Sequence, residues 1–407
     1  MKIFIVSNGC PRRLLDSSRI AQYFILNGCQ IVDKPQTADY IIFITCSFIK
    51  AREEQCWRYI DELKKYKGEL IILGCLPEII PTKFSQEFKG KYLSTKNLSK
   101  IDALFSEFKI KFSDIPDTGS LYPNPKEFKQ EVYSNVIGWL VRASNRFFML
   151  FTSRKSFFKK ILKALKIYGI KTGLFKNKCA YLRVSNGCIE NCSYCSIVKA
   201  IGKLTSKPIK DCVSEYKRFL DKGFREFVIL GDNTGAYGLD IGSSFGEFLE
   251  NLAIVSGNYD VSWHLEQIHP RWIFRYKTEI LKMVKEKKVR KISCSIQSGS
   301  NRILKLMNRH HTIEEITEAL LLFRKYNSEL KLRTDIIVGF PSETEEDFRA
   351  TLDAIKKIQF NYVFVYPYYD GYETIASNLD NKIGPEIMEK RMKIAERFLD
   401  QEGILEQ

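Results

Sequence analysis

The run Tyr181-Leu-Arg-Val-Ser-Asn-Gly-Cys188-Ile-Glu-Asn-Cys192-Ser-Tyr-Cys195 contains three cysteines in the spacing CxxxCxxC. We call Cys188, Cys192 and Cys195 the loop triad. Three thiolates within one tight loop are enough to hold three irons of a four-iron cluster, whereas a cluster that only transfers electrons normally has its fourth iron ligated as well. A zinc knuckle would need two further Cys or His ligands nearby, and no second knuckle follows. The spacing therefore predicts a four-iron cluster with one open iron.

An open iron is a position where the amine and carboxylate of S-adenosylmethionine can bind, and an electron from the cluster can then break the sulfonium bond.

From Cys179 onward, strand-like runs alternate with helical stretches, and two of the helices open with the capping-box patterns Thr312–Glu315 and Ser342–Glu345. The six predicted strands are 180–185, 226–231, 261–267, 291–297, 334–340 and 362–366. Six βα units are two short of a closed eightfold barrel. We expect an open (β/α)6 barrel, a partial TIM barrel, with the loop triad above its first strand.

The first hundred residues predict a separate α/β unit with a parallel, Rossmann-like sheet. Three short apolar, β-branched runs read as buried strands at 2–7, 40–45 and 69–74. Helical patterns lie between them at 14–27 and 51–67, with Gly28 and Gly68 as the expected C-caps. A cysteine follows each run, and we call Cys10, Cys46 and Cys75 the N-terminal triad. The carboxyl ends of parallel strands share one edge of the sheet, so these thiols should converge in a geometry suited to a second cluster. The alternative is simple burial, which we prefer for Cys29 and Cys56.

Composition agrees with an enzyme of the reducing cytoplasm. A chain of 407 residues divides into two or three domains, and eleven cysteines are too sparse for a disulfide scaffold. The N-terminus shows no cleavable signal pattern, and no uncharged run approaches the length of a membrane span. The net charge of +16 suggests an acidic or polyanionic partner without specifying the chemistry.

The two halves together resemble the radical S-adenosylmethionine methylthiotransferases over nearly all of residues 1–110 and 179–400. The N-terminal pieces that carry the resemblance are Asn8-Gly-Cys10, Asp16-Ser17, Ala38-Asp39, Thr45-Cys46 and Gly74-Cys75. The barrel pieces are Arg183 through Cys195, Gln297-Ser-Gly-Ser-Asn-Arg through Met307-Asn-Arg309, and Asp335-Ile-Ile-Val-Gly-Phe-Pro-Ser-Glu-Thr344. A CxxxCxxC motif alone would indicate only the wider radical superfamily.

The resemblance implies two [4Fe-4S] clusters and S-adenosylmethionine as cofactors. The loop triad would hold the radical-generating cluster, and the N-terminal triad would hold the auxiliary cluster that presents sulfur to the substrate. Tyr194 would pack beside the adenine, with an ordinary core aromatic as the alternative. Arg333 would pair with the methionyl carboxylate, unless it is an ordinary surface arginine. The other expected cofactor contacts are Gly231 and Asp232 at the methionyl amine, Gln297 and Ser298 at the ribose, and Gly339, Phe340 and Pro341 at the adenine.

The chain also departs from the pattern of this family. The arginines that usually follow the cysteine loop are replaced by Val198, Ile201-Gly202, Thr205 and Lys207. We also expect no counterpart of the family's RNA-gripping TRAM module after the last helix. Between Val132 and Ile189 there is no acidic residue, and Phe157 and Phe158 recur among lysines at helical spacing. Three of the alternatives for this basic segment are binding alternatives: to RNA phosphates, to an anionic membrane surface, or to an apolar groove on a partner or on the enzyme itself. The fourth alternative is an ordinary solvent-exposed face.

These observations predict an enzyme that inserts a methylthio group at an unactivated C–H bond of a peptide or protein, such as a ribosomally made peptide under maturation. A tRNA adenosine methylthiotransferase is the second hypothesis, and a non-catalytic cluster carrier is the third. We expect a cytoplasmic monomer that takes electrons from a donor such as flavodoxin or ferredoxin. The expected domains are 1–109 with the auxiliary cluster, 110–178 as a basic linker or insertion, 179–370 as the radical barrel, and 371–407 as a helical extension.

Overall fold

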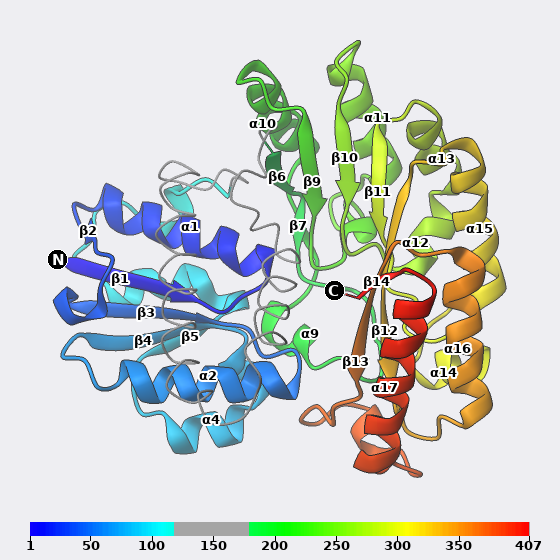
Figure 1. Ribbon diagram of the computed structural model, residues 1–407. Coiled ribbons are helices and arrows are strands. Elements are labelled where there is room, and N and C mark those ends of the chain that lie inside the picture. The colour runs from blue at the N-terminus through cyan, green and yellow to red at the C-terminus, as the bar shows by residue number, and fades with distance from the viewer. Residues whose placement is uncertain (118–178, 407) are drawn as a thin grey trace. The chain divides into compact units, whose positions relative to one another are not determined.

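The computed structural model describes residues 1–117 and 179–406, shown as solid ribbons in Figure 1. The described residues form two compact units. The first contains residues 1–117 together with 196–202, and the second contains 179–195 and 203–406. The part of the basic segment from Val132 to Lys178 lies outside the described residues.

The N-terminal unit is a five-stranded parallel sheet with helices between its strands. Its elements are β1 (Lys2–Ser7), α1 (Pro11–Leu26), β2 (Gln30–Ile31), β3 (Tyr40–Thr45), α2 (Lys50–Leu63), β4 (Glu69–Gly74), α3 (Leu76–Ile79), α4 (Pro81–Glu87), β5 (Tyr92–Ser94) and α5 (Ile101–Leu104). The strand order is β2-β1-β3-β4-β5, so the three predicted strands are neighbours at the centre. Ile3, Ile42 and Ile71, one from each of these strands, lie in a single buried cluster with Phe24 and Phe105.

The second unit is built from strands that alternate with helices. Its elements are β6 (Cys179–Arg183), β7 (Ser185–Asn186), β8 (Thr205–Ser206), α10 (Ile209–Asp221), β9 (Glu226–Leu230), α11 (Phe245–Ser256), β10 (Ser262–Leu265), α12 (Pro270–Arg275), α13 (Lys277–Lys285), β11 (Val289–Ser293), α14 (Asn301–Leu306), α15 (Ile313–Tyr326), β12 (Lys331–Val338), α16 (Glu345–Ile358), β13 (Tyr362–Pro367), α17 (Pro385–Gln401) and β14 (Leu405–Glu406). The helix α9 (Ile197–Ile201) follows the cysteine loop and belongs to the first unit.

The six predicted strands form one parallel sheet in chain order, from β6 through β9 to β13, and the two-residue β14 pairs with β13. This sheet is the predicted open α/β barrel with one short additional strand, and Figure 1 shows its strands fanned with α11, α13, α15 and α16 outside them. One face of each strand is buried in a large apolar core, exemplified by Leu182, Phe227, Trp263 and Leu332. The alternate residues of the strands therefore form the inner face.

Two details of the helix termini differ from the sequence prediction. The Thr312–Glu315 capping box of α15 is present, but α16 is capped by Thr344 with Asp347, not by Ser342 with Glu345. Ser342 has a φ of 67°, whereas an N-cap requires extended backbone such as Thr344 adopts. Gly68 does not cap α2, because that helix ends at Leu63 with Lys64 as its cap.

No helix among the described residues is both long and apolar enough to span a membrane.

Candidate active site

The cysteines of the N-terminal triad come together at one edge of the first sheet. Cys46 and Cys75 directly follow β3 and β4, and Cys10 is the N-cap of α1 just beyond β1. The Cys46 thiol donates a hydrogen bond to the Cys10 sulfur, which lowers the pKa of Cys10 and raises that of Cys46 well above its ordinary value. The negative charge of Cys75 also raises the pKa of Cys46. The three thiols are therefore near neighbours, as the parallel sheet predicted.

Backbone and side-chain hydrogen bonds fix the strand ends that carry these thiols. Asn8 accepts the Cys46 N–H at 2.9 Å and donates to the Cys56 sulfur at 3.2 Å. The Cys75 N–H donates to the Thr45 carbonyl at 3.1 Å. Cys56 is buried on α2 and donates to the Cys46 carbonyl at 3.4 Å, so this fourth thiol supports the loop that carries Cys46. Burial raises the pKa of Cys56 to about 12, which keeps it a neutral thiol.

The loop triad lies beyond the carboxyl end of β6, and each described contact of its sulfurs comes from a hydrogen-bond donor. The Cys188 sulfur accepts from the Glu190 N–H at 3.3 Å and from Asn233 Nδ2 at 3.5 Å. The Cys192 sulfur accepts from Arg309 Nη1 at 3.7 Å. Burial raises the pKa of Cys188 to about 12, and the charges of Cys195 and Cys192 act in the same direction. These three thiols also lie within reach of one another's charge.

Asp232 lies beside the loop triad, just after β9. Its Oδ2 accepts the Gly187 N–H at 2.9 Å, immediately before Cys188 in the chain. Gly231 leaves no room for a side chain, because an added Cβ would lie 2.5 Å from Ser185 Oγ. The next residue, Asn233, was not singled out in the sequence although it adjoins these two. It connects Cys188 to Glu190, whose carboxylate accepts from Asn233 at 3.0 Å.

The residues expected at the ribose differ in their surroundings. Gln297 has a φ of 68°, and its Oε1 is buried without a hydrogen-bond partner among the described residues. Asn233 Oδ1 is in the same situation. Ser298 is fully buried instead, shares a 3.3 Å hydrogen bond with Thr351, and accepts the Ser300 N–H at 3.1 Å. Gln297 thus has an acceptor to offer a ligand, whereas the hydroxyl of Ser298 is satisfied within the protein.

The aromatic side of the expected cofactor site is one small cluster. Tyr194 and Phe340 pack together with Ile303 and Met307, and the Phe340 ring lies edge-on to Tyr368 at 5.4 Å. Burial raises the pKa of Tyr194 well above its ordinary value. Gly339 precedes Phe340 with a φ of 79°, and Pro341 after it is buried.

Arg333 lies on the inner face of the barrel within a network of charged groups. Its guanidinium contacts Glu266 at 3.1 Å and Asp335 at 3.3 Å, and it lies over the Phe364 ring at 4.4 Å. Phe364 and Tyr366 are stacked with ring centroids 5.9 Å apart. The structure therefore pairs Arg333 with two carboxylates of the protein itself.

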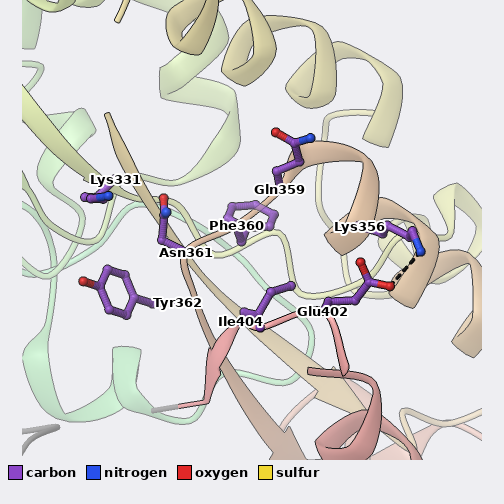
Figure 2. A pocket seen from close by; sticks show the side chains of 9 residues that line it. Lys331, Lys356, Gln359, Phe360, Asn361, Tyr362, Glu402 and Ile404 are labelled. Atoms are coloured by element: carbon purple, nitrogen blue, oxygen red, sulfur yellow. Dashed lines mark hydrogen bonds and ion pairs between the residues drawn. The ribbon is translucent and has the colours of Figure 1, made fainter. Parts of the chain in front are cut away.

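A cavity of about 530 Å³ lies at the other end of the barrel strands, where β12 and β13 begin (Figure 2). Lys331, Tyr362 and Glu402 are among its lining residues, and Glu402 accepts from Lys356 at 2.6 Å. None of the residues predicted for the site lines this cavity.

The two thiol triads fit iron–sulfur clusters better than a single ion. Among residues 1–117 and 179–406, no group of three or more His, Cys, Asp or Glu side chains is arranged to hold a metal ion. In a four-iron cluster each thiolate ligates a different iron, so the ligands do not surround one ion. The loop triad, the hydrogen-bond donors around it and the buried, unpartnered oxygens of Gln297 and Asn233 together fit a cluster with a polar ligand beside it.

Comparisons with known proteins agree with this chemistry. Residues 182–355 match the model of the Radical SAM superfamily, and residues 2–93 match that of the Uncharacterized protein family UPF0004. The chain is similar to the structure of the radical S-adenosylmethionine methyltransferase TsrM from Kitasatospora setae, with a TM-score of 0.58 at 11% identity over 90% of this chain and 74% of that one. At this identity the likeness shows the fold alone.

Relatives that match over most of their own length are more specific. The tRNA-2-methylthio-N(6)-dimethylallyladenosine synthase of Aquifex aeolicus is 28% identical over 96% of this chain and 82% of its own length. The ribosomal protein uS12 methylthiotransferase RimO of Carboxydothermus hydrogenoformans is 30% identical over 96% of this chain and 80% of its own length. The chain therefore belongs to the radical S-adenosylmethionine methylthiotransferases, enzymes that use two [4Fe-4S] clusters and S-adenosylmethionine.

Proposed function

We propose that this enzyme inserts a methylthio group at an unactivated C–H bond of a peptide or protein. The observation that carries the proposal is the pairing of charges on the inner face of the barrel. Lys291 lies 3.4 Å from Glu266, and Arg333 is held between Glu266 and Asp335. RNA binding depends on cations that can neutralise phosphates. These two cations are already neutralised by carboxylates, so this surface suits a peptide better than a nucleic acid.

Two observations favour tRNA as the second candidate. The net charge of the whole chain is +16, and several relatives are named as tRNA-modifying enzymes. The relatives named for ribosomal protein uS12 reach 30% identity, slightly above the 26–28% of the tRNA enzymes. We place the peptide first because the charge pairing lies on the inner face itself. A ribosomally made peptide under maturation is the narrower form of this proposal.

The residues of the site divide the work of holding the cofactors. We assign the radical-generating cluster to the loop triad and the auxiliary cluster to the N-terminal triad. When bound, S-adenosylmethionine and the first cluster supply a radical that takes a hydrogen atom from the substrate, and the auxiliary cluster supplies sulfur. Asp232 holds the cysteine loop through the Gly187 N–H, and Gln297 offers its unpartnered Oε1 to a ligand hydroxyl. Tyr194 and Phe340 exclude water from the apolar side of the site.

The proposal extends to the compartment, the reductant, the oligomeric state and the domains of the enzyme. All eleven cysteines are free, which suits a reducing compartment such as the cytoplasm, and we infer a small electron-transfer protein such as flavodoxin or ferredoxin as the reductant. We propose that the enzyme acts as a monomer. We also propose the division into an auxiliary-cluster domain (1–109), a basic connector (110–178), the barrel (179–370) and a helical extension (371–407). The family matches at 2–93 and 182–355 support the first and third of these.

The test is a competition between the two substrate classes. The anaerobically reconstituted enzyme is incubated with S-adenosylmethionine, reductant, total tRNA, a uS12-derived peptide and peptides encoded near its gene. We expect a mass increase of about 46 in a peptide, as a thiomethyl group replaces hydrogen, and none with the Cys188→Ala control. Methylthiolated adenosine in the RNA fraction, with unmodified peptides, would overturn the proposal in favour of tRNA.

A further inference from the structure

The cysteine loop is held by the residues that end α14. The Ser193 N–H donates to the Met307 carbonyl at 3.0 Å, and the Ser193 hydroxyl donates to the Leu306 carbonyl at 2.8 Å. Asn308 Nδ2 donates to the Asn191 carbonyl at 2.6 Å. These contacts join two segments that lie more than a hundred residues apart in the chain and hold the backbone around Cys192.

Arg309 adds a contact of another kind, because it reaches a sulfur. Its Nη1 lies 3.7 Å from the Cys192 sulfur and 3.1 Å from the Tyr194 hydroxyl, and its Nη2 donates to the Ser295 carbonyl. Only 6% of the residue is exposed. A guanidinium retains its positive charge when buried, and water screens that charge little at this depth. The cysteine loop therefore has a fixed cation with a hydrogen-bond donor aimed at one of its sulfurs.

Hydrogen bonds to the ligating sulfurs, net charge and solvent exposure set the reduction potential of an iron–sulfur cluster. Reduction adds one negative charge, and a nearby buried cation stabilises the reduced form more than the oxidised form. We propose that Arg309 is a positioning residue that raises the reduction potential of the cluster held by the loop triad, through its contact with Cys192. This inference rests on the proposed assignment of the loop triad as the ligands of that cluster.

The experiment is a redox titration followed by electron paramagnetic resonance of the full chain, with the N-terminal triad replaced by alanine so that only the barrel cluster contributes. In this background, Arg309→Gln should lower the ratio of reduced to oxidised cluster about tenfold at a fixed solution potential, which is a midpoint shift of ~59 mV for a one-electron couple. Arg309→Lys retains the charge on a shorter side chain and should shift the midpoint in the same direction by less.

Asn308→Ala is the matched control, because Asn308 holds the same loop through the Asn191 carbonyl but reaches no sulfur in the described contacts. Its midpoint should stay at that of the background protein. Equal shifts in Asn308→Ala and Arg309→Gln, or an unmoved midpoint in Arg309→Gln, would overturn the inference. If Arg309→Gln fails to take up iron, an unmoved midpoint in Arg309→Lys overturns it instead. A background protein without any cluster would refute the ligand assignment, an outcome distinct from a cluster whose midpoint does not move.

Discussion

Replacing Arg391 by methionine should destabilise the barrel by about 3–5 kcal/mol, because it leaves the carboxylate of Glu343 buried without its cation. Arg391 Nη1 lies 2.7 Å from Glu343 Oε2, and the two side chains are 6% and 1% exposed. Glu343 Oε2 also accepts the Gly339 N–H at 2.7 Å. The pair therefore connects α17 to the turn that carries Gly339, Phe340 and Pro341, the stretch expected beside the adenine.

The loss should depend on pH in a defined direction. Burial raises the pKa of Glu343 from its ordinary value of 4.5 to about 7, while the Gly339 N–H and Arg391 oppose the rise. A carboxyl whose folded-state pKa is raised stabilises the fold fully below its unfolded value, and this contribution is lost as the pH rises through the folded value. Without Arg391 the folded-state pKa should rise beyond 7. Each further unit by which the folded-state pKa rises lowers the free energy of unfolding by about 1.4 kcal/mol at pH values above both the folded-state and the unfolded-state pKa.

The assay is urea denaturation of the full chain at pH 5.5 and pH 8, followed by far-ultraviolet circular dichroism. Arg391→Met should lose more stability at pH 8 than at pH 5.5, and adding Glu343→Gln should recover most of the loss because neither charge then remains. Arg397→Met, an exposed position on the same helix, should stay within about 0.5 kcal/mol of the wild type. Equal losses at both pH values, or a loss no larger than that of the control, would refute the reasoning.

Two further predictions concern the thiol triads. Replacing the loop triad by alanine should lower the iron content from about eight to about four per chain and abolish cleavage of S-adenosylmethionine; unchanged iron on elemental analysis would contradict the assignment. Replacing the N-terminal triad should preserve 5′-deoxyadenosine formation, measured by chromatography, and eliminate sulfur transfer, since radical generation needs only the barrel cluster. A methylthiolated product from that second variant would show that these cysteines do not hold the sulfur-donating cluster and only pack in the fold.

The strands were the most predictable part of the fold because each is a short, nearly continuous apolar run. The three N-terminal strands, 2–7, 40–45 and 69–74, are confirmed with the predicted bounds. The edge strands β2 and β5 were missed because they have only two and three residues, too few to show a pattern. The capping box of α16 was displaced by two residues because Ser342 and Thr344 both suit a cap, and only backbone conformation distinguishes them.

Within the site, the sequence could predict the residues that share one loop or one edge of a sheet. It could not predict the residues that reach the site from a distant segment of the chain. The neighbourhood of Cys10, Cys46 and Cys75 follows from parallel pairing, which brings the strand ends together whatever their distance in the chain. The contact between Arg309 and Cys192 spans 117 residues and depends on how α14 ends, so no local pattern reveals it.

Gln297 and Ser298 show the same limit between adjacent residues. Both belong to one motif, and the sequence assigns them jointly to the ribose. In the structure the Ser298 hydroxyl turns to Thr351 of α16, where it is fully buried, while Gln297 adopts a left-handed conformation and retains an unpartnered acceptor. A positive φ in a non-glycine residue is strained and persists where the surroundings enforce it, commonly at a ligand site. The proposed ribose contact therefore rests on Gln297, and Ser298 serves to join the start of α14 to α16.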